Sequence, residues 1–77
     1  MDQITIRNVV VEEVKKVLKE EVNLNSNMEN TAVWDSLKKI DVIFAIEDRF
    51  GVRFDKEVLE YLNSTLAISD EVAKILK

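Results

Sequence analysis

Apolar residues recur every three or four positions along most of this chain, and this spacing constrains its fold more than any other feature. In the first segment the recurring residues are Ile6, Val10, Val14, Val17 and Leu18. Residues at this spacing share one face of a helix, so the pattern predicts a helix from about Gln3 to Glu21. The β-branched residues would also suit a strand. The charge pairs Glu12–Lys16 and Glu13–Lys16 lie at helical spacing and favour the helix.

A polar stretch follows, from Asn23 to Asp35, and it is rich in asparagine, serine and threonine. Such side chains compete for backbone hydrogen bonds and favour turns. About a dozen residues is long for a connection in a small domain. We therefore expect a loop that spans the length of a helical bundle, anchored by Leu24, Met28 and Val33.

The next apolar segment predicts a second helix, from Ser36 to Phe50. Proline is absent and Gly51 is the one glycine of the chain, so Gly51 is the clearest stop signal. A glycine just beyond a helix takes the left-handed conformation without steric cost, and Arg49 in the last turn suits the helix dipole.

Two shorter helices are expected after Gly51. Asp55 is placed to cap a short third helix, with Phe54 and Leu59 at the spacing of a hydrophobic staple. The last helix contains Val72, Ala73, Ile75 and Leu76. Its start is ambiguous, because Thr65 and Ser69 can each serve as the cap. The predicted class is all-α, a single domain over residues 1–77 with four helices, a long first loop and a short third helix.

Composition narrows the function. The chain has no cysteine and no histidine, the usual ligands of structural zinc, so no metal site is expected. For the same reason Ser36 has no evident base to activate it for catalysis. A net charge of −4 argues against nucleic acid as a partner, since phosphate binding needs a basic surface. Without a long apolar run or a signal-peptide pattern, we expect a cytoplasmic protein with no stable membrane insertion. An enzyme is not expected.

The second predicted helix carries two apolar faces. Val42, Ile43, Ile46 and Phe50 fall within about 100° of arc and form the predicted core face. Leu37, Ile40 and Phe44 fall within about 60° on a different side. Asp41, Glu47 and Asp48 border this second face. An apolar patch with an acidic rim is typical of a protein-docking surface. The alternative is that the second face packs under the long loop or the third helix.

The residues around Ser36 carry a family resemblance. The triplet Asp35-Ser36-Leu37 opens the second helix, which ends in Glu47-Asp48-Arg49-Phe50-Gly51. Together with the chain length, helix order and acidic composition, this arrangement resembles the acyl carrier protein family. The likeness covers essentially the whole chain. The alternative for Ser36 is an ordinary helix N-cap.

The resemblance implies a function and a cofactor. Ser36 would carry 4′-phosphopantetheine, transferred from coenzyme A by a phosphopantetheinyl transferase, and Asp35 and Leu37 would flank the attachment site. Acyl groups would be held on the arm as thioesters and presented by a monomer to acyl-loading, acyl-transfer and condensing enzymes. The expected partner-facing residues are Leu37, Lys38, Ile40, Asp41, Phe44, Glu47 and Asp48.

The chain also departs from the commonest family pattern. Trp34 stands where a small residue is usual and is expected to anchor the loop, and Lys38 and Lys39 stand where an acid is usual. These departures favour a specialised lipid, polyketide or modification pathway. The stretch from Ala67 to Asp70 lacks the threonine usual at the start of the last helix. A D-alanyl or aminoacyl carrier and an unmodified protein-interaction module remain alternatives.

Overall fold

The computed structural model describes residues 1–76 and contains four α-helices in the predicted order. They are α1 (Gln3–Leu18), α2 (Ser36–Phe50), α3 (Lys56–Leu59) and α4 (Thr65–Leu76). Residues 1–76 form no strand, only an isolated antiparallel pairing of Asn27 with Ser64. The all-α class is confirmed. None of these four helices combines the length and the apolar character that crossing a membrane requires.

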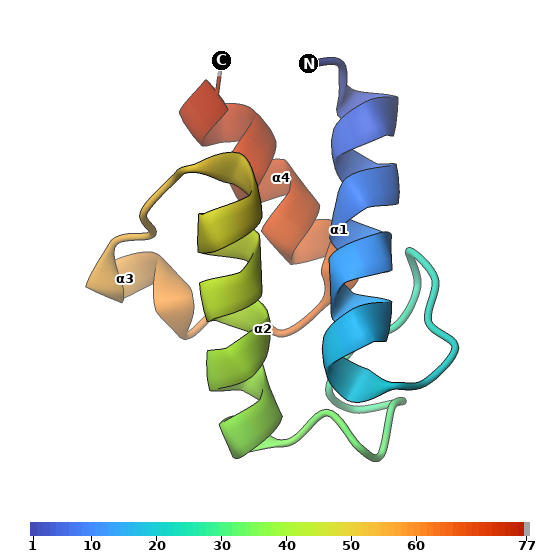
Figure 1. The fold of residues 1–77 in the computed structure, drawn as a ribbon. Coiled ribbons are helices and arrows are strands. Elements are labelled where there is room, and N and C mark those ends of the chain that lie inside the picture. The colour runs from blue at the N-terminus through green and yellow to red at the C-terminus, as the bar shows by residue number, and fades with distance from the viewer. Residues whose placement is uncertain (77) are drawn as a thin grey trace.

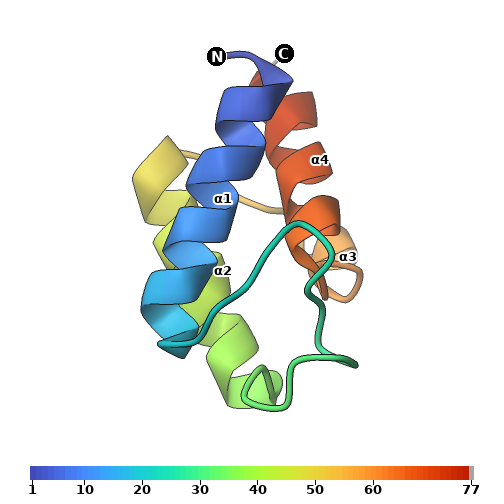
Figure 2. The same ribbon diagram turned by 90° about the vertical axis from the view of Figure 1, so that its right-hand side faces the viewer.

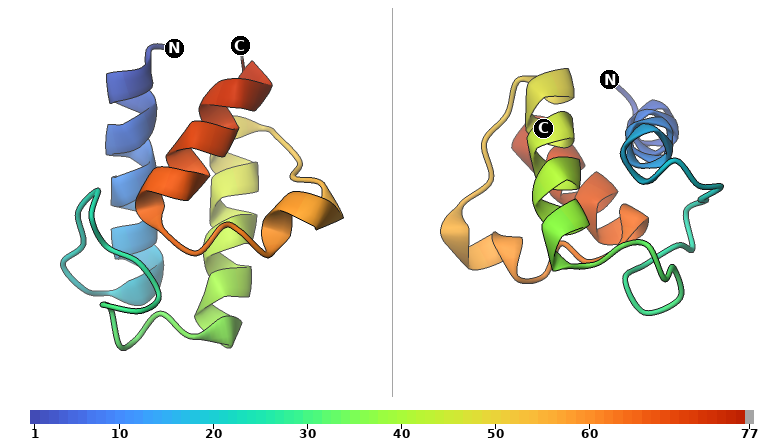
Figure 3. Two further views of the ribbon diagram at one scale, coloured as in Figure 1. Left: turned by 180° about the vertical axis from the view of Figure 1, so that it is seen from behind. Right: turned by 60° about the horizontal axis from the view of Figure 1, so that its bottom comes forward.

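Helices α1, α2 and α4 make the body of a small bundle, and α3 lies to one side of it (Figure 1). Helix α1 packs against both α2 and α4. The start of α1 and the end of α4 lie together at one end of the bundle (Figures 1 and 2). Helix α2 begins at the other end, where the long first loop delivers the chain (Figure 3). The fold therefore presents the start of α2 away from both ends of the described chain.

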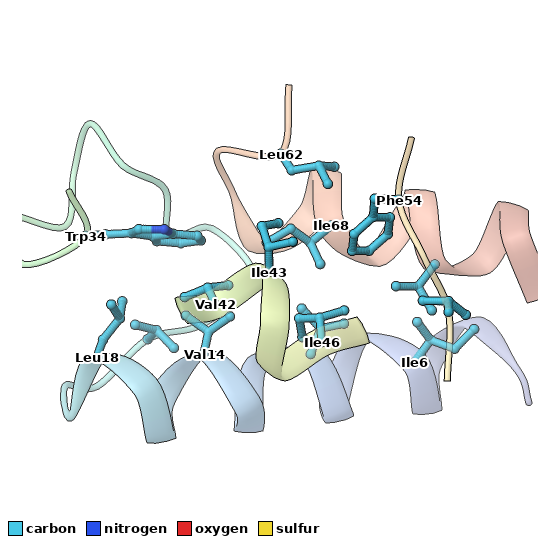
Figure 4. Close-up of a cluster of buried hydrophobic side chains, with 14 residues drawn as sticks. Ile6, Val14, Leu18, Trp34, Val42, Ile43, Ile46, Phe54, Leu62 and Ile68 are labelled. Atoms are coloured by element: carbon cyan, nitrogen blue, oxygen red, sulfur yellow. The ribbon is translucent and has the colours of Figure 1, made fainter. Parts of the chain in front are cut away.

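The core is a single cluster of aliphatic side chains with two aromatic rings (Figure 4). Its buried members are Ile6, Val10, Val14 and Leu18 of α1, Val42, Ile43 and Ile46 of α2, Ile68 and Val72 of α4, and Val22, Trp34, Val52, Phe54 and Leu62 of the connections. The predicted core faces of α1 and α2 are confirmed. Val17 and Phe50 are only half-buried at the margin of the cluster.

Helix α1 is shorter than predicted. It ends at Leu18, and Lys19 adopts a left-handed φ of 55° while its N–H donates to the Lys15 carbonyl at 2.8 Å. Glycine or asparagine usually takes this position, and other residues adopt positive φ only rarely. The expected end at Glu21 is wrong by about one turn, because the lysine that ends the helix carries no stop signal.

Charged side chains connect α1 to α2. The predicted pairs are present, with Lys16 Nζ 4.0 Å from Glu12 and 3.4 Å from Glu13. Arg49 of α2 reaches across to the same carboxylates, at 3.0 Å from Glu13 and 3.5 Å from Glu12. Pairs this close to solvent contribute little stability individually. They lie at the margin of the contact between α1 and α2.

The first loop is anchored by most of the residues expected, and Val33 is the exception. Trp34 is 1% exposed, which confirms its role as a loop anchor, and Val22 is also buried. Leu24 and Met28 are half-buried, as an anchoring role requires. Val33 is exposed, so its assignment as an anchor is wrong. Val33 lies in a turn that the Trp34 N–H closes by donating to the Thr31 carbonyl at 2.9 Å, and the adjacent Trp34 occupies the core in place of Val33.

The starts of the last two helices correct the predictions. Asp55 precedes α3, but its side chain makes no capping hydrogen bond. Helix α4 begins with Thr65, so its start lies earlier in the chain than the stretch from Ala67 to Asp70, which lacks a threonine. Neither predicted cap serves: the cap is Ser64, whose Oγ accepts from the Ala67 N–H at 3.0 Å. Ser69 lies inside the helix and its Oγ donates to the Thr65 carbonyl at 2.8 Å.

Candidate functional site

Ser36 lies at the first helical position of α2, one residue after the cap. Asp35 has extended backbone angles, and its carboxylate accepts from the Lys38 N–H at 2.9 Å. The Asp35 carbonyl accepts from the Lys39 N–H at 2.8 Å, which starts the helix. Asp35 therefore performs the capping that was the alternative role for Ser36. The Ser36 side chain is exposed, and its hydroxyl makes no hydrogen bond with residues 1–76.

The surroundings of the Ser36 hydroxyl suit a phosphodiester. The first N–H groups of a helix have no intrahelical acceptor and carry the positive end of the dipole. The Ser36 and Leu37 N–H groups make no hydrogen bond with other described residues. Lys38 lies in the same turn, and no carboxylate of residues 1–76 pairs with it. A cation near a helix N-terminus is unfavourable by itself, and an anion attached to Ser36 would offset it.

An exposed apolar stripe runs along α2 from the serine. Leu37 is 75% exposed, Ile40 52% and Phe44 63%. The alternative, that these residues pack under the loop or α3, is wrong. Exposing a large aromatic and two aliphatic side chains on one helix costs hydration free energy. This apolar stripe is therefore the surface of α2 that gains most from contact with another molecule.

The acidic rim of the apolar stripe consists of Asp41 and Asp48, and both are exposed. Glu47, which we expected on this rim, is 8% exposed and faces inward. Its carboxylate accepts from the Phe54 N–H at 2.9 Å and from Arg53 Nη1 at 3.4 Å. The segment after Gly51 folds back over Glu47 and uses its charge to satisfy a buried backbone donor. The placement of Glu47 on the docking surface is wrong.

The two lysines after Ser36 have separate environments. Lys39 is half-buried, and its Nζ donates to Asn63 Oδ1 at 2.7 Å, which ties the start of α2 to the segment before α4. On the helical wheel Lys39 falls within the arc of the core face, so its apolar stem can lie along the core side of the helix. Lys38 is also half-buried, on the opposite flank of the apolar stripe. Lys38 is the one of the two that stays available to an external group.

A shallow groove at the far end of the apolar stripe was not predicted. It has a volume of about 670 Å³ and is lined by Phe44, Asp48, Val52 and Arg53, among others. Arg53 is outside the helix and highly exposed, so it adds a positive charge to an otherwise acidic rim. The sequence contained one signal of this positive charge: Arg53 lies between two apolar residues, Val52 and Phe54.

Comparison with known proteins does not assign this chain to a family. No protein-family model matches this chain, and no curated protein matches it significantly. We therefore base the functional proposal on the chain's own residues: a serine that the fold does not use, at the start of a helix whose exposed side is apolar with an acidic rim.

Proposed function

We propose that this chain is an acyl carrier protein, modified with 4′-phosphopantetheine at Ser36. The observation that carries the proposal is that two neighbouring residues at the start of α2 have separate roles. Asp35 caps the helix, and the neighbouring hydroxyl of Ser36 is exposed and has no partner within residues 1–76. A serine needed only for folding would take the capping position.

The modification is a transfer of one phosphoryl-linked group. The Ser36 Oγ attacks the β-phosphorus of coenzyme A, the bond from that phosphorus to the bridging oxygen breaks, and adenosine 3′,5′-bisphosphate leaves. A base on the transferase takes the hydroxyl proton, since this chain contains no histidine and its acids near Ser36 serve the helix cap. The arm supplies a thiol, which the chain lacks, and acyl groups are carried on it as thioesters.

The apolar stripe and its rim suit transient partners. Leu37, Ile40 and Phe44 supply apolar area, and Asp41 and Asp48 supply charges that orient a basic partner surface. Charges of this kind raise association rates more than they slow dissociation. A carrier that visits several enzymes needs this combination, because each complex must form quickly and also separate.

Intact-mass measurement tests the modification. The folded protein is incubated with coenzyme A and a broad-specificity phosphopantetheinyl transferase. We expect a gain of one phosphopantetheinyl unit, lost completely in Ser36→Ala. Ser64→Ala is the matched control, because Ser64 is also a serine at the start of a helix, but its Oγ is engaged as the cap. This variant should still be modified. If several transferases leave the folded wild type unmodified, an interaction module becomes the better account.

Charge reversal on the rim tests the docking surface. In Asp41→Lys/Asp48→Lys we expect kcat/KM for modification by the transferase to fall about tenfold, with thermal stability nearly unchanged. The matched control is Glu29→Lys/Asp70→Lys, which makes the same change in net charge at exposed positions away from α2. Equal rates for the two double variants would mean that net charge, not the rim, sets the rate.

A further inference from the structure

A second groove lies on a different side of the molecule from Ser36. It runs between α1 and the limb of the first loop that rises beside α1 (Figure 2). Its volume of about 590 Å³ falls within the range of small-molecule sites. None of its lining residues belongs to α2 or α3. The groove is therefore separate from the apolar stripe and from the attachment site.

The middle of this groove is apolar. Val11 on α1 and Val22 and Leu24 on the loop line it, and Ile4, 69% exposed, lies at one end. Val11 and Leu24 are only half-buried, so the fold leaves part of their surface to solvent. An occupant with a hydrocarbon segment would remove this area from water.

Arg7 lines the same groove and has no counter-charge. Its Nε is buried, yet it has no hydrogen-bond acceptor, and no carboxylate of residues 1–76 forms an ion pair with Arg7. A buried donor without an acceptor is rare in native proteins and calls for a reason. In a chain with a net charge of −4, an arginine without a carboxylate is also unexpected. Nε is the one guanidinium nitrogen that is buried without an acceptor, so an anion would reach Arg7 through its outer nitrogens, Nη1 and Nη2.

The other charged groups of the groove are already paired. Lys15 lies 3.5 Å from Glu21, and Glu12 lies 3.5 Å from Arg49. Arg7, Val11 and Lys15 are spaced by four residues and lie along one side of α1. From Arg7 to Lys15 the helix rises roughly 12 Å, at about 1.5 Å per residue. One positive charge without an ion pair thus stands near one end of an open groove with a mostly apolar lining, along which a medium-length chain would lie.

We propose that this groove binds a small amphipathic monocarboxylate, with its carboxylate on Arg7 and its hydrocarbon chain along Val11 and Leu24. Arginine presents a planar set of donors that matches a carboxylate. The apolar walls exclude a purely ionic ligand, and the single charge excludes a purely apolar one. This binding does not depend on whether Ser36 is modified.

The test uses sodium decanoate, below its micelle concentration, with ¹⁵N- and methyl-labelled protein. We expect saturable NMR shifts at Ile4, Val11 and Leu24. Decanol has the same chain without the charge, and it should bind about tenfold more weakly. Arg7→Gln should weaken decanoate about tenfold and leave decanol within twofold. Lys15→Gln is the matched control, and it should leave decanoate within about twofold because Lys15 already faces Glu21.

Three results would overturn the proposal. The first is the absence of saturable shifts in the groove. The second is a set of shifts confined to Leu37, Ile40 and Phe44, which would mean that decanoate simply coats the apolar stripe. The third is equal affinity for decanoate and decanol. The last comparison needs only the wild type, so it decides the matter even if Arg7→Gln fails to fold.

Discussion

Two helices of this chain begin with the same kind of residue pair, a capping side chain followed by a hydroxyl. At α2 the pair is Asp35 and Ser36, and at α4 it is Ser64 and Thr65. The caps are alike, since Asp35 Oδ1 accepts an N–H at 2.9 Å and Ser64 Oγ accepts one at 3.0 Å. Up to this point the two helix starts are equivalent.

The hydroxyls that follow have different uses. Thr65 is fully buried, and its Oγ1 lies 2.9, 2.8 and 3.3 Å from the carbonyl oxygens of Asn23, Leu24 and Ser26. A hydroxyl has one hydrogen, so these three acceptors of the first loop share it. The Ser36 hydroxyl is exposed and has no partner within residues 1–76. Because the caps match, tertiary surroundings alone make one hydroxyl structural and leave the other free for chemistry.

The largest effect is expected at Trp34, which holds the open helix start in place. Trp34→Ala should cost about 3–5 kcal/mol in the free energy of unfolding, because a large, fully buried side chain is removed from the core. Urea unfolding followed by circular dichroism measures it. Trp34→Phe is the control: it keeps an aromatic ring and removes the buried Nε1–H, which has no acceptor within residues 1–76.

We expect Trp34→Phe to cost clearly less than Trp34→Ala, because the phenyl ring leaves a smaller cavity and the lost N–H had no acceptor. If Trp34→Ala were equally mild, the start of α2 would be held by the Asp35 cap and not by the indole. The contrast between the two helix starts would then depend on local capping more than on the core.

Removing each hydroxyl in turn tests whether the fold uses Thr65 and not Ser36. Thr65→Val keeps the shape but leaves the Leu24 carbonyl without a donor, whereas the Asn23 and Ser26 carbonyls keep backbone N–H donors, and it should cost about 1–3 kcal/mol. Ser36→Ala should change the free energy of unfolding by less than about 0.5 kcal/mol, as is usual for an exposed site. Urea unfolding of both variants checks this. A Ser36→Ala cost equal to that of Thr65→Val would show that the fold uses Ser36 after all.

The sequence was sufficient where local chemistry decides the structure. The bounds of α2 follow from the polar-to-apolar change at Asp35 and Ser36 and from Gly51, which has a φ of 66°. The exposed apolar stripe followed from helical geometry alone, because one helix in so small a bundle has only one core-facing side. The four-helix order was likewise predictable from the spacing of apolar residues.

The sequence was insufficient where distant segments meet. Glu47 is inside because the Phe54 N–H, seven residues away, needs an acceptor. Thr65 is buried because the first loop crosses it, more than thirty-five residues earlier in the chain. Lys19 ends α1 in a conformation that its side chain does not favour. No spacing rule within a single segment contains the contacts of Glu47 and Thr65, and no local stop signal marks Lys19, so the docking rim and two helix boundaries were misplaced.

A third helix start offers the smallest test, through pH. Asp2 caps α1, and its carboxylate accepts from the Thr5 N–H at 2.7 Å. The hydrogen bonds from Thr5 lower the pKa of Asp2 below its ordinary value of 3.8. A lowered pKa means that the cap contributes its full stability above the ordinary pKa and loses it as the pH falls through the lowered pKa.

We therefore expect α1 to fray at its start in acid, seen as an amide shift of Thr5 in an NMR titration that tracks the Asp2 carboxyl. Asp2→Asn is the matched control, because asparagine also caps helices but does not titrate in this range. Its Thr5 amide should stay constant through the same interval. If both proteins titrated alike, another acid would govern the start of α1. Asp35 would then be the one carboxylate in residues 1–76 that acts as an ordinary helix cap, and it leaves the serine beside it free.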